Sequence, residues 1–296
     1  MWDLNRLRLL RELELRGTIA AVAAALDYSP SNVSQQLAQL EREVGVALLE
    51  PDGRRLRLTG AGRIVARHAE EVIRLEERAR ARLAPGDSTP VTVRVATIAS
   101  AARALVPGAL HLLAARAPRV RVELAVVAPE HGLAELEAHR YDLVLAEQYP
   151  GHARERRAGV DHEHLGNDPI HVVVPPDCHA RTLPELAERP WVLEPQGSAA
   201  RHWALQQCRG AGFEPDVICE SADLETHIAL IASGHAVGIL PDLVWARRSP
   251  ALALIELPEP LERELFTAVR ASSASDAGVR AVRAALQSAF VELSAR

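Results

Sequence analysis

Apolar residues near the start of the chain recur at helical spacing. Leu4, Leu7 and Leu10 lie three residues apart, which predicts a first helix with one apolar face. The alanine-rich segment 19–26 predicts a second, short helix, for which Thr18 is the capping residue. Strand-like alternation is missing from this region until near residue 60, so the chain begins with a helical unit.

A third helix, predicted from about residue 31 to residue 41, has one apolar and one polar face. Ser29 provides a capping hydroxyl, and Pro30 suits the first helical position. The apolar positions are Val33, Leu37, Leu40 and Val44. The opposite face consists of Ser31, Asn32, Ser34, Gln35 and Gln39. Short hydroxyls and amides suit hydrogen bonds to base edges and phosphates, so this face predicts contact with a nucleic acid.

Two short helices joined by a tight turn form a helix-turn-helix, whose second helix lies in the DNA major groove. A small three-helix bundle with a polar face is the alternative. The dipeptide Asp52–Gly53 then predicts a hairpin turn before the alternating segment 56–58. Such a wing would carry Arg54 and Arg55 at its tip, where they can reach phosphates or the minor groove.

A long helix is predicted from Thr59 to about Leu83. Its apolar stripe is close to a heptad seam, which favours a role as a dimerisation strut. Packing of this helix on its own domain is the alternative. The stripe consists of Ala61, Val65, His68, Val72, Leu75, Ala79 and Leu83.

Residues 84–90 have the composition of a hinge, and alternating strands and helices follow them. Strands are expected at 91–95, 120–126, 142–146, 170–174, 191–193, 217–219, 237–240 and 264–270. Helices are expected near 103–116, 131–139, 199–210, 223–233 and 278–293. The fold class is therefore α/β behind a helical N-terminal unit.

Composition narrows the class of protein. The chain has 296 residues, of which 48% are hydrophobic and 25% charged, as in ordinary globular proteins. It has no apolar stretch long enough to span a bilayer and no basic-then-apolar leader, so we expect a cytoplasmic protein without membrane contact. The three cysteines are far apart, which favours reduced thiols. The net charge of −5 divides into +2 over residues 1–86 and −7 over 87–296, so the basic excess is at the front.

Signals for catalysis or metal binding are weak. The segment Asp161–His164 has two histidines at i and i+2 without a third ligand at a recognisable spacing, so we interpret it as a solvated loop. Nucleophile-elbow, phosphate-loop and dinucleotide motifs are absent. We therefore expect no metal and no cofactor.

Two sets of residues match the motifs of one known family. In the first 80 residues they are Leu7, Gly17–Thr18, Ala23–Ala24, Leu26, Ser29, Val33–Ser34, Gln36–Leu37, Leu40–Glu41, Gly45–Val46, Leu48–Leu49, Leu58–Thr59 and Gly62. Beyond them they are Gly132–Leu136, Tyr141–Leu145, Asp168–Ile170, Leu183–Leu186 and Ala232–Pro241. On these residues the chain resembles the LysR-type bacterial transcriptional regulators over nearly its whole length.

The resemblance implies a winged helix-turn-helix DNA-binding domain at 1–60, a linker helix and hinge at 61–86, and an effector domain at 87–296. It implies a sequence-specific regulator that binds double-stranded DNA as a homodimer or homotetramer, with RNA polymerase as a further partner. Base contacts map to Pro30, Ser31, Ser34 and Gln35, and phosphate contacts to Thr18, Arg54 and Arg55. Gln35 stands where arginine is frequent in the family, but it can still bind adenine with two hydrogen bonds.

The effector domain of the family resembles a periplasmic binding protein, with two α/β lobes around a cleft. Lobe one would comprise about 91–164 and 266–296, and lobe two about 165–265. By position, the cleft residues would be Thr97, Ile98, Ser100, Gln196, Gly197 and Ser198. Hydroxyls beside helix N-termini favour a small anionic effector such as a carboxylate. A plain helix cap is the alternative for both Ser100 and Ser198.

Two other functions remain open from the residues alone. A solute-binding protein would use the two-lobed region but would leave the first 80 residues without a role. A metabolic enzyme would need a catalytic constellation in the cleft. Binding of duplex DNA by residues 1–86 separates both of these from a regulator.

Overall fold

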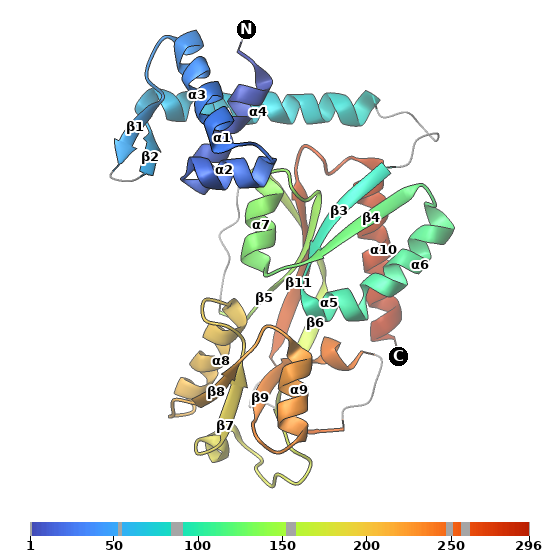
Figure 1. Ribbon diagram of the computed structural model, residues 1–296. Coiled ribbons are helices and arrows are strands. Elements are labelled where there is room, and N and C mark those ends of the chain that lie inside the picture. The colour runs from blue at the N-terminus through green and yellow to red at the C-terminus, as the bar shows by residue number, and fades with distance from the viewer. Residues whose placement is uncertain are drawn as a thin grey trace. The chain divides into compact units, whose positions relative to one another are not determined.

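The computed structural model describes residues 2–52, 55–83, 91–151, 158–246, 251–255 and 261–295. The chain divides into two compact units, residues 1–86 and residues 87–296, and each is described by itself (Figure 1). Among the described helices, none is both long enough and apolar enough to cross a membrane.

The first unit is a winged helix-turn-helix. Its elements are α1 (Leu4–Arg16), α2 (Ile19–Leu26), α3 (Pro30–Val44), β1 (Leu49–Asp52), β2 (Arg55–Leu58) and α4 (Gly60–Leu83). The side chains of Asp3, Thr18 and Ser29 cap the first three helices, and left-handed Gly17 and Gly45 end α1 and α3. Residues from all four helices and the wing form one core, which includes Leu10, Val22, Val33, Leu37, Leu40 and Leu48. The three short helices and the hairpin expected from the sequence are confirmed.

The two halves of the long helix α4 differ in burial. Val65, Ala66 and Ala69 are buried in the core of the first unit, where α4 packs against α1. Packing on its own domain, the alternative interpretation, is therefore correct for the first half of the helix. Leu75, further along, is 61% exposed. Among the described side chains of the stripe, Leu75 and Ala79 in the second half are exposed.

Gly62 lies where α4 approaches the wing too closely for any side chain. Its N–H donates to the Thr59 hydroxyl (3.0 Å), and a Cβ at Gly62 would lie 2.2 Å from the carbonyl oxygen of Leu48. We expect Gly62→Ala to destabilise the first unit by about 1–3 kcal/mol, because backbone has to move. Thermal unfolding followed by circular dichroism measures the effect. Gly60→Ala is the matched control, since nothing lies within 4 Å of its Cβ, and an equal loss in both variants would contradict the packing argument.

Lobe one of the second unit is built on a five-stranded sheet. Its strands are β3 (Val91–Thr97), β4 (Val120–Val126), β5 (Leu143–Gln148), β6 (Val160–Val174) and β11 (Glu262–Arg270). The order is β6-β11-β5-β3-β4, with β3 parallel to β4 and β5, and β11 antiparallel to its neighbours (Figure 1). Its helices are α5 (Ala99–Ala104), α6 (Val106–Arg116), α7 (Pro129–Glu137) and α10 (Ala277–Ser294).

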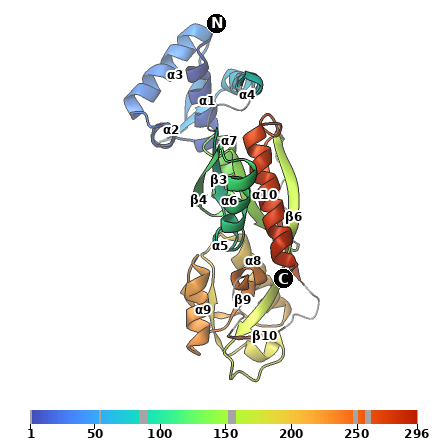
Figure 2. The same cartoon turned by 90° about the vertical axis from the view of Figure 1, so that its right-hand side faces the viewer.

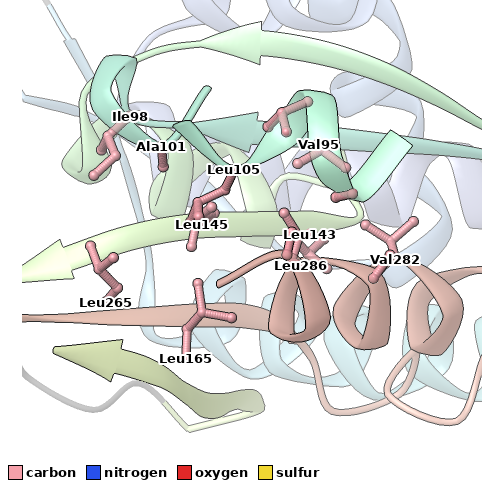
Figure 3. Close-up of a cluster of buried hydrophobic side chains, with 14 of the residues drawn as sticks. Val95, Ile98, Ala101, Leu105, Leu143, Leu145, Leu165, Leu265, Val282 and Leu286 are labelled. Carbon is pink, nitrogen blue, oxygen red and sulfur yellow. The ribbon is translucent and has the colours of Figure 1, made fainter. Parts of the chain in front are cut away.

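Alternation along β5 explains why helices cover both faces of this sheet. Leu143 and Leu145 belong to the core that α6 and α10 complete, and Figure 3 shows Leu286 of α10 beside Leu143. Val144 and Ala146 face the other way, into the core that includes Leu136 of α7. All four β5 residues are fully buried, as expected for a strand with helices on both sides.

Lobe two surrounds the far end of β6. Its strands are β7 (Pro190–Leu193), β8 (Asp216–Glu220), β9 (Gly238–Pro241) and β10 (Ala253–Ile255), and its helices are α8 (Ala199–Gly210), α9 (Leu224–Ala232) and the short 3₁₀ helices η1 (Leu183–Leu186) and η2 (Asp242–Trp245). β9 and β10 pair with the end of β6, and β7 pairs with β8. Figure 2 shows β9, β10 and α9 grouped apart from the α6 and α10 helices of lobe one. Trp191 and Trp203 are fully buried in the core of this lobe.

The structure corrects three sequence-based expectations. The segment Asp161–His164 is not a solvated loop but part of β6, paired with β11 from Phe266 to Val269. Its two acidic residues form ion pairs with Arg283, which lies 2.6 Å from Asp161 and 3.2 Å from Glu163. The short strand β10 was not anticipated.

The third correction concerns the helix expected near 103–116. This region forms two helices, α5 and α6, that meet at Leu105. Pro107 lacks an N–H and its ring would clash with the carbonyl four residues earlier, so it favours a break in the helix at this point.

Candidate functional site

The exposed face of α3 carries the four residues expected to read bases. Pro30, Ser31, Ser34 and Gln35 are all exposed at the start of the helix. Ser29 accepts a hydrogen bond from the Asn32 N–H (3.2 Å), so the helix start is held in place. Within the described part of the chain, the side chains of Ser34 and Gln35 make no hydrogen bond. Their polar groups are therefore available to a ligand.

The three residues expected at phosphates are placed less completely. Thr18 caps α2, with its hydroxyl oxygen accepting from the Ala21 N–H (3.2 Å), and its own proton remains available for donation. Arg54 lies outside the described residues. Arg55 opens β2 opposite Asp52, but its side chain also lies outside the description.

A cavity of about 420 Å³ lies between the two lobes of the second unit. Five of the six expected cleft residues line it, namely Ile98, Ser100, Gln196, Gly197 and Ser198. The exception is Thr97, which is 1% exposed and donates its hydroxyl to the carbonyl of Ile98 (3.4 Å). Thr97 is thus part of the interior of lobe one and not of the cavity wall.

In lobe two, the turn before α8 gives its residues structural roles. Ser198 caps α8 by accepting from the Arg201 N–H (3.1 Å), so the helix-cap interpretation is correct for this residue. Its own N–H donates to the Pro195 carbonyl (3.2 Å), which closes a turn with Gly197 at φ +87°. A left-handed residue at the third position of such a turn favours glycine.

The helix-cap interpretation is wrong for Ser100. It lies within α5, whose N-cap position is Ile98, and Ile98 makes no capping hydrogen bond. The Ser100 hydroxyl instead accepts from Nη2 of Arg263 (2.8 Å).

Arg263 is the centre of a buried polar cluster beside the cavity. Its guanidinium contacts the Glu147 carboxylate and lies 2.7 Å from the Asp168 carboxylate. The second oxygen of Asp168 accepts from the Leu243 N–H (2.9 Å). Burial raises the pKa of Asp168, and the charge of Arg263 opposes that shift. Because Arg263 and Asp168 belong to β11 and β6, the two strands that cross between the lobes, the cluster joins the lobes at their crossover.

Glu194, directly after β7, is the most perturbed acid of the cavity wall. Burial, with the nearby charge of Glu147 as the second cause, raises the pKa of Glu194 to about 8. Glu130, in the first turn of α7, is a third carboxylate that lines the cavity. The wall is therefore rich in acidic groups.

The sequence analysis did not single out Arg263, Glu147 or Glu194. Glu147 and Glu194 had a usable signal, since each follows an apolar run that reads as a strand. Ligands of α/β proteins commonly bind at the carboxyl ends of such strands. Arg263 had none, because it stands between two glutamates in an ordinary alternating strand.

Family comparisons agree with this arrangement of units. Residues 4–63 match the model of the bacterial regulatory helix-turn-helix proteins of the lysR family. Residues 87–291 match the LysR substrate binding domain. Together the two matches cover the helix α3 with its exposed polar face and the residues that line the cavity.

Individual proteins give the same result. The chain is 27% identical to the transcriptional dual regulator GltC of Bacillus subtilis over 266 residues, which cover 87% of each chain. Full-length OxyR from Pseudomonas aeruginosa has the same fold, with a TM-score of 0.66 at 22% identity over 98% of this chain and 95% of that one. The LysR-family regulator CbnR in complex with its target DNA gives a TM-score of 0.54 at 21% identity, over 97% and 99% of the two chains. The chain therefore belongs to the LysR family of transcriptional regulators, which are DNA-binding, effector-responsive proteins and not enzymes.

Proposed function

We propose that this regulator binds operator DNA as a homodimer or homotetramer, with Pro30, Ser31, Ser34 and Gln35 at the bases. The observation that carries the proposal is the exposed start of α3, where Ser34 and Gln35 have no hydrogen-bond partner among the described residues. Thr18 and the wing arginines Arg54 and Arg55 would hold phosphates on either side. The protein would act in the cytoplasm, where bacterial DNA lies, and RNA polymerase stays a predicted further partner.

The second half of α4 supports the oligomer. Leu75 and Ala79 are exposed there, on the stripe that the first unit does not use. Pairing of two such helices would present two identical heads related by a two-fold axis. The operator is then expected to contain two half-sites with dyad symmetry.

A small molecule in the inter-lobe cavity would control the response. Lobe one lines the cavity with Ile98 and Ser100, and lobe two with Gln196 and Ser198. A ligand that touches both lobes has a different affinity for each arrangement of the lobes, and that difference is what shifts the equilibrium. Couplings of this kind are typically about 1–3 kcal/mol.

The test of base reading is Gln35→Ala. We expect a loss of about 1–3 kcal/mol in binding to the cognate operator and little change on random DNA, because the amide would read a base edge and not a phosphate. Titrations of both DNAs at one fixed salt concentration measure the two affinities. Gln206→Ala, an exposed glutamine in α8, is the control and should bind as the parent does. Equal losses on operator and random DNA would contradict the assignment of Gln35.

A further inference from the structure

We propose that the inter-lobe cavity takes a small organic cation, a ligand with an ammonium or guanidinium group that binds the carboxylate of Glu194. The inference rests on the proposed function, in which the ligand of this cavity is the effector. It goes beyond that function by assigning the sign of the charge that the effector presents. The sequence analysis expected an anion.

The charges around the cavity carry the inference. Its lining includes three carboxylates, those of Glu130, Glu147 and Glu194, and one guanidinium, that of Arg263. Arg263 already contacts Glu147 and forms an ion pair with Asp168, so its charge is more than balanced before any ligand arrives. An anionic ligand would enter a wall with an excess of negative groups.

Glu194 is the carboxylate that lacks a partner. Within the described residues, no donor is within hydrogen-bond distance of its side chain. Arg201 directs its Nη1 to Glu220 (2.7 Å) and to the backbone carbonyl of Glu194 (3.1 Å), and not to the Glu194 side chain. A cationic group in the cavity would provide the partner that the protein does not.

The helix N-termini that favoured an anion exert a weaker electrostatic effect on a ligand than these carboxylates do. A helix N-terminus has the effect of about half an elementary charge, and the effect falls off within one turn. Ser198 already caps α8, and Asp223 caps α9 by accepting from the Glu225 N–H (3.1 Å). The buried carboxylate of Glu147 and the unpaired carboxyl of Glu194, which loses its proton when a cation binds, therefore decide the preference.

The remaining wall indicates an organic ligand and not a bare metal ion. Ile98, Val126, Val127 and Leu224 supply apolar surface, together with several alanines. The volume of about 420 Å³ is that of a pocket for a small molecule. A short hydrocarbon chain with a cationic end matches both features.

Proton linkage distinguishes a cation from an anion. Since the pKa of Glu194 is raised to about 8, the group binds a proton in the empty cavity near neutral pH, and a bound cation would expel it. Cation affinity should then rise with pH from 7 to 8.5, by at most about tenfold per unit, whereas the affinity for an anion should fall. The other titratable or charged groups that face Glu194 are Glu147 and Tyr149 from β5 and its end, Glu130 from α7, Arg263 from β11, Arg201 from α8, Glu220 from β8 and His227 from α9.

The experiment measures binding to the full chain by calorimetry at pH 7.0 and pH 8.5. The cationic probes are agmatine, putrescine and L-arginine. L-citrulline is the neutral match for L-arginine, and succinate and benzoate are the anions. We expect at least one cationic probe to bind, more tightly at pH 8.5, and the neutral and anionic probes to bind at least tenfold more weakly.

Matched variants assign the effect to Glu194. Glu194→Gln should weaken the bound cation at least tenfold and remove the pH dependence, and Glu130→Gln should weaken it less, since Glu130 is at the exposed rim. Glu188→Gln, an exposed glutamate of lobe two outside the cavity lining, should bind as the parent does. The melting temperature of each variant shows whether it is folded.

Three results would overturn the proposal. They are binding of none of the cationic probes, tighter binding of succinate or benzoate that weakens as pH rises, and cation binding that Glu194→Gln leaves unchanged. None of them bears on the DNA-binding function, which the Gln35→Ala titration tests on its own.

Discussion

Replacement of Arg263 by methionine is expected to destabilise the second unit by about 3–5 kcal/mol, because it leaves buried carboxylates without their cation. Arg263 is 1% exposed, and its neighbours Glu147 and Asp168 are 5% and 3% exposed. Methionine fills similar space, so the loss reports the missing charge and hydrogen bonds. Urea unfolding of the full chain, followed by tryptophan fluorescence, to which the buried Trp191 and Trp203 of lobe two contribute, measures it.

Two further variants separate the buried charge from other effects. Arg209→Met removes the exposed pair with Glu214 (2.5 Å), and exposed ion pairs contribute little. The triple variant Arg263→Met, Glu147→Gln, Asp168→Asn removes both carboxylate charges and should recover much of the stability lost in the single variant. If Arg263→Met unfolded at the same urea concentration as Arg209→Met, the cluster would not hold the lobes as described.

The second large effect concerns pH. Glu194 has a pKa of about 8 in the folded chain and an ordinary pKa of 4.5 when unfolded, so the folded state binds its proton more tightly. The protonated Glu194 therefore adds to the free energy of unfolding. This contribution is fully present below about pH 4.5 and is lost as pH rises through 8. At about 1.36 kcal/mol per pKa unit, the loss between these limits is at most about 5 kcal/mol.

Glu194→Gln should remove this dependence, because the amide does not titrate. The ligand-free variant is expected to be more stable than the parent at pH 8.5 and close to it at pH 5. Urea unfolding at both pH values measures the difference, and Glu188→Gln provides the control for a lost exposed carboxylate. If the free energies of unfolding of the parent and of Glu194→Gln changed with pH in the same way, the raised pKa of Glu194 would be contradicted.

The cavity shows where sequence reasoning succeeds and fails. Ser198 was recognisable as a helix cap, since capping depends on a few neighbouring residues. Ser100 occupies a similar place in the sequence, yet its hydroxyl binds Arg263, which is far away along the chain. Thr97 was expected beside a ligand because it was placed just after the first strand of this unit, but β3 extends to Thr97, and its side chain is buried there.

The long strands show a related limit. The start of β6 reads as a polar loop because Asp161, His162, Glu163 and His164 lack apolar alternation. It is a strand because β11 and Arg283 provide its hydrogen bonds and its charge partner. Tertiary pairing overrode a weak local preference, as is common for strands.

The sequence by itself determined the helix-turn-helix, the wing and most elements of the second unit. Periodicity, caps and turn residues act over a few positions, so they can be interpreted without knowledge of distant contacts. The sequence also identified the exposed polar face of α3, since all residues of that face belong to one helix and their spacing along the sequence is enough to place them. The character of the cavity was decided only by the tertiary structure. Glu130, Glu147, Glu194 and Arg263 come from four separate segments, and their pKa values and pairing depend on burial and distance, which exist only after the chain has folded.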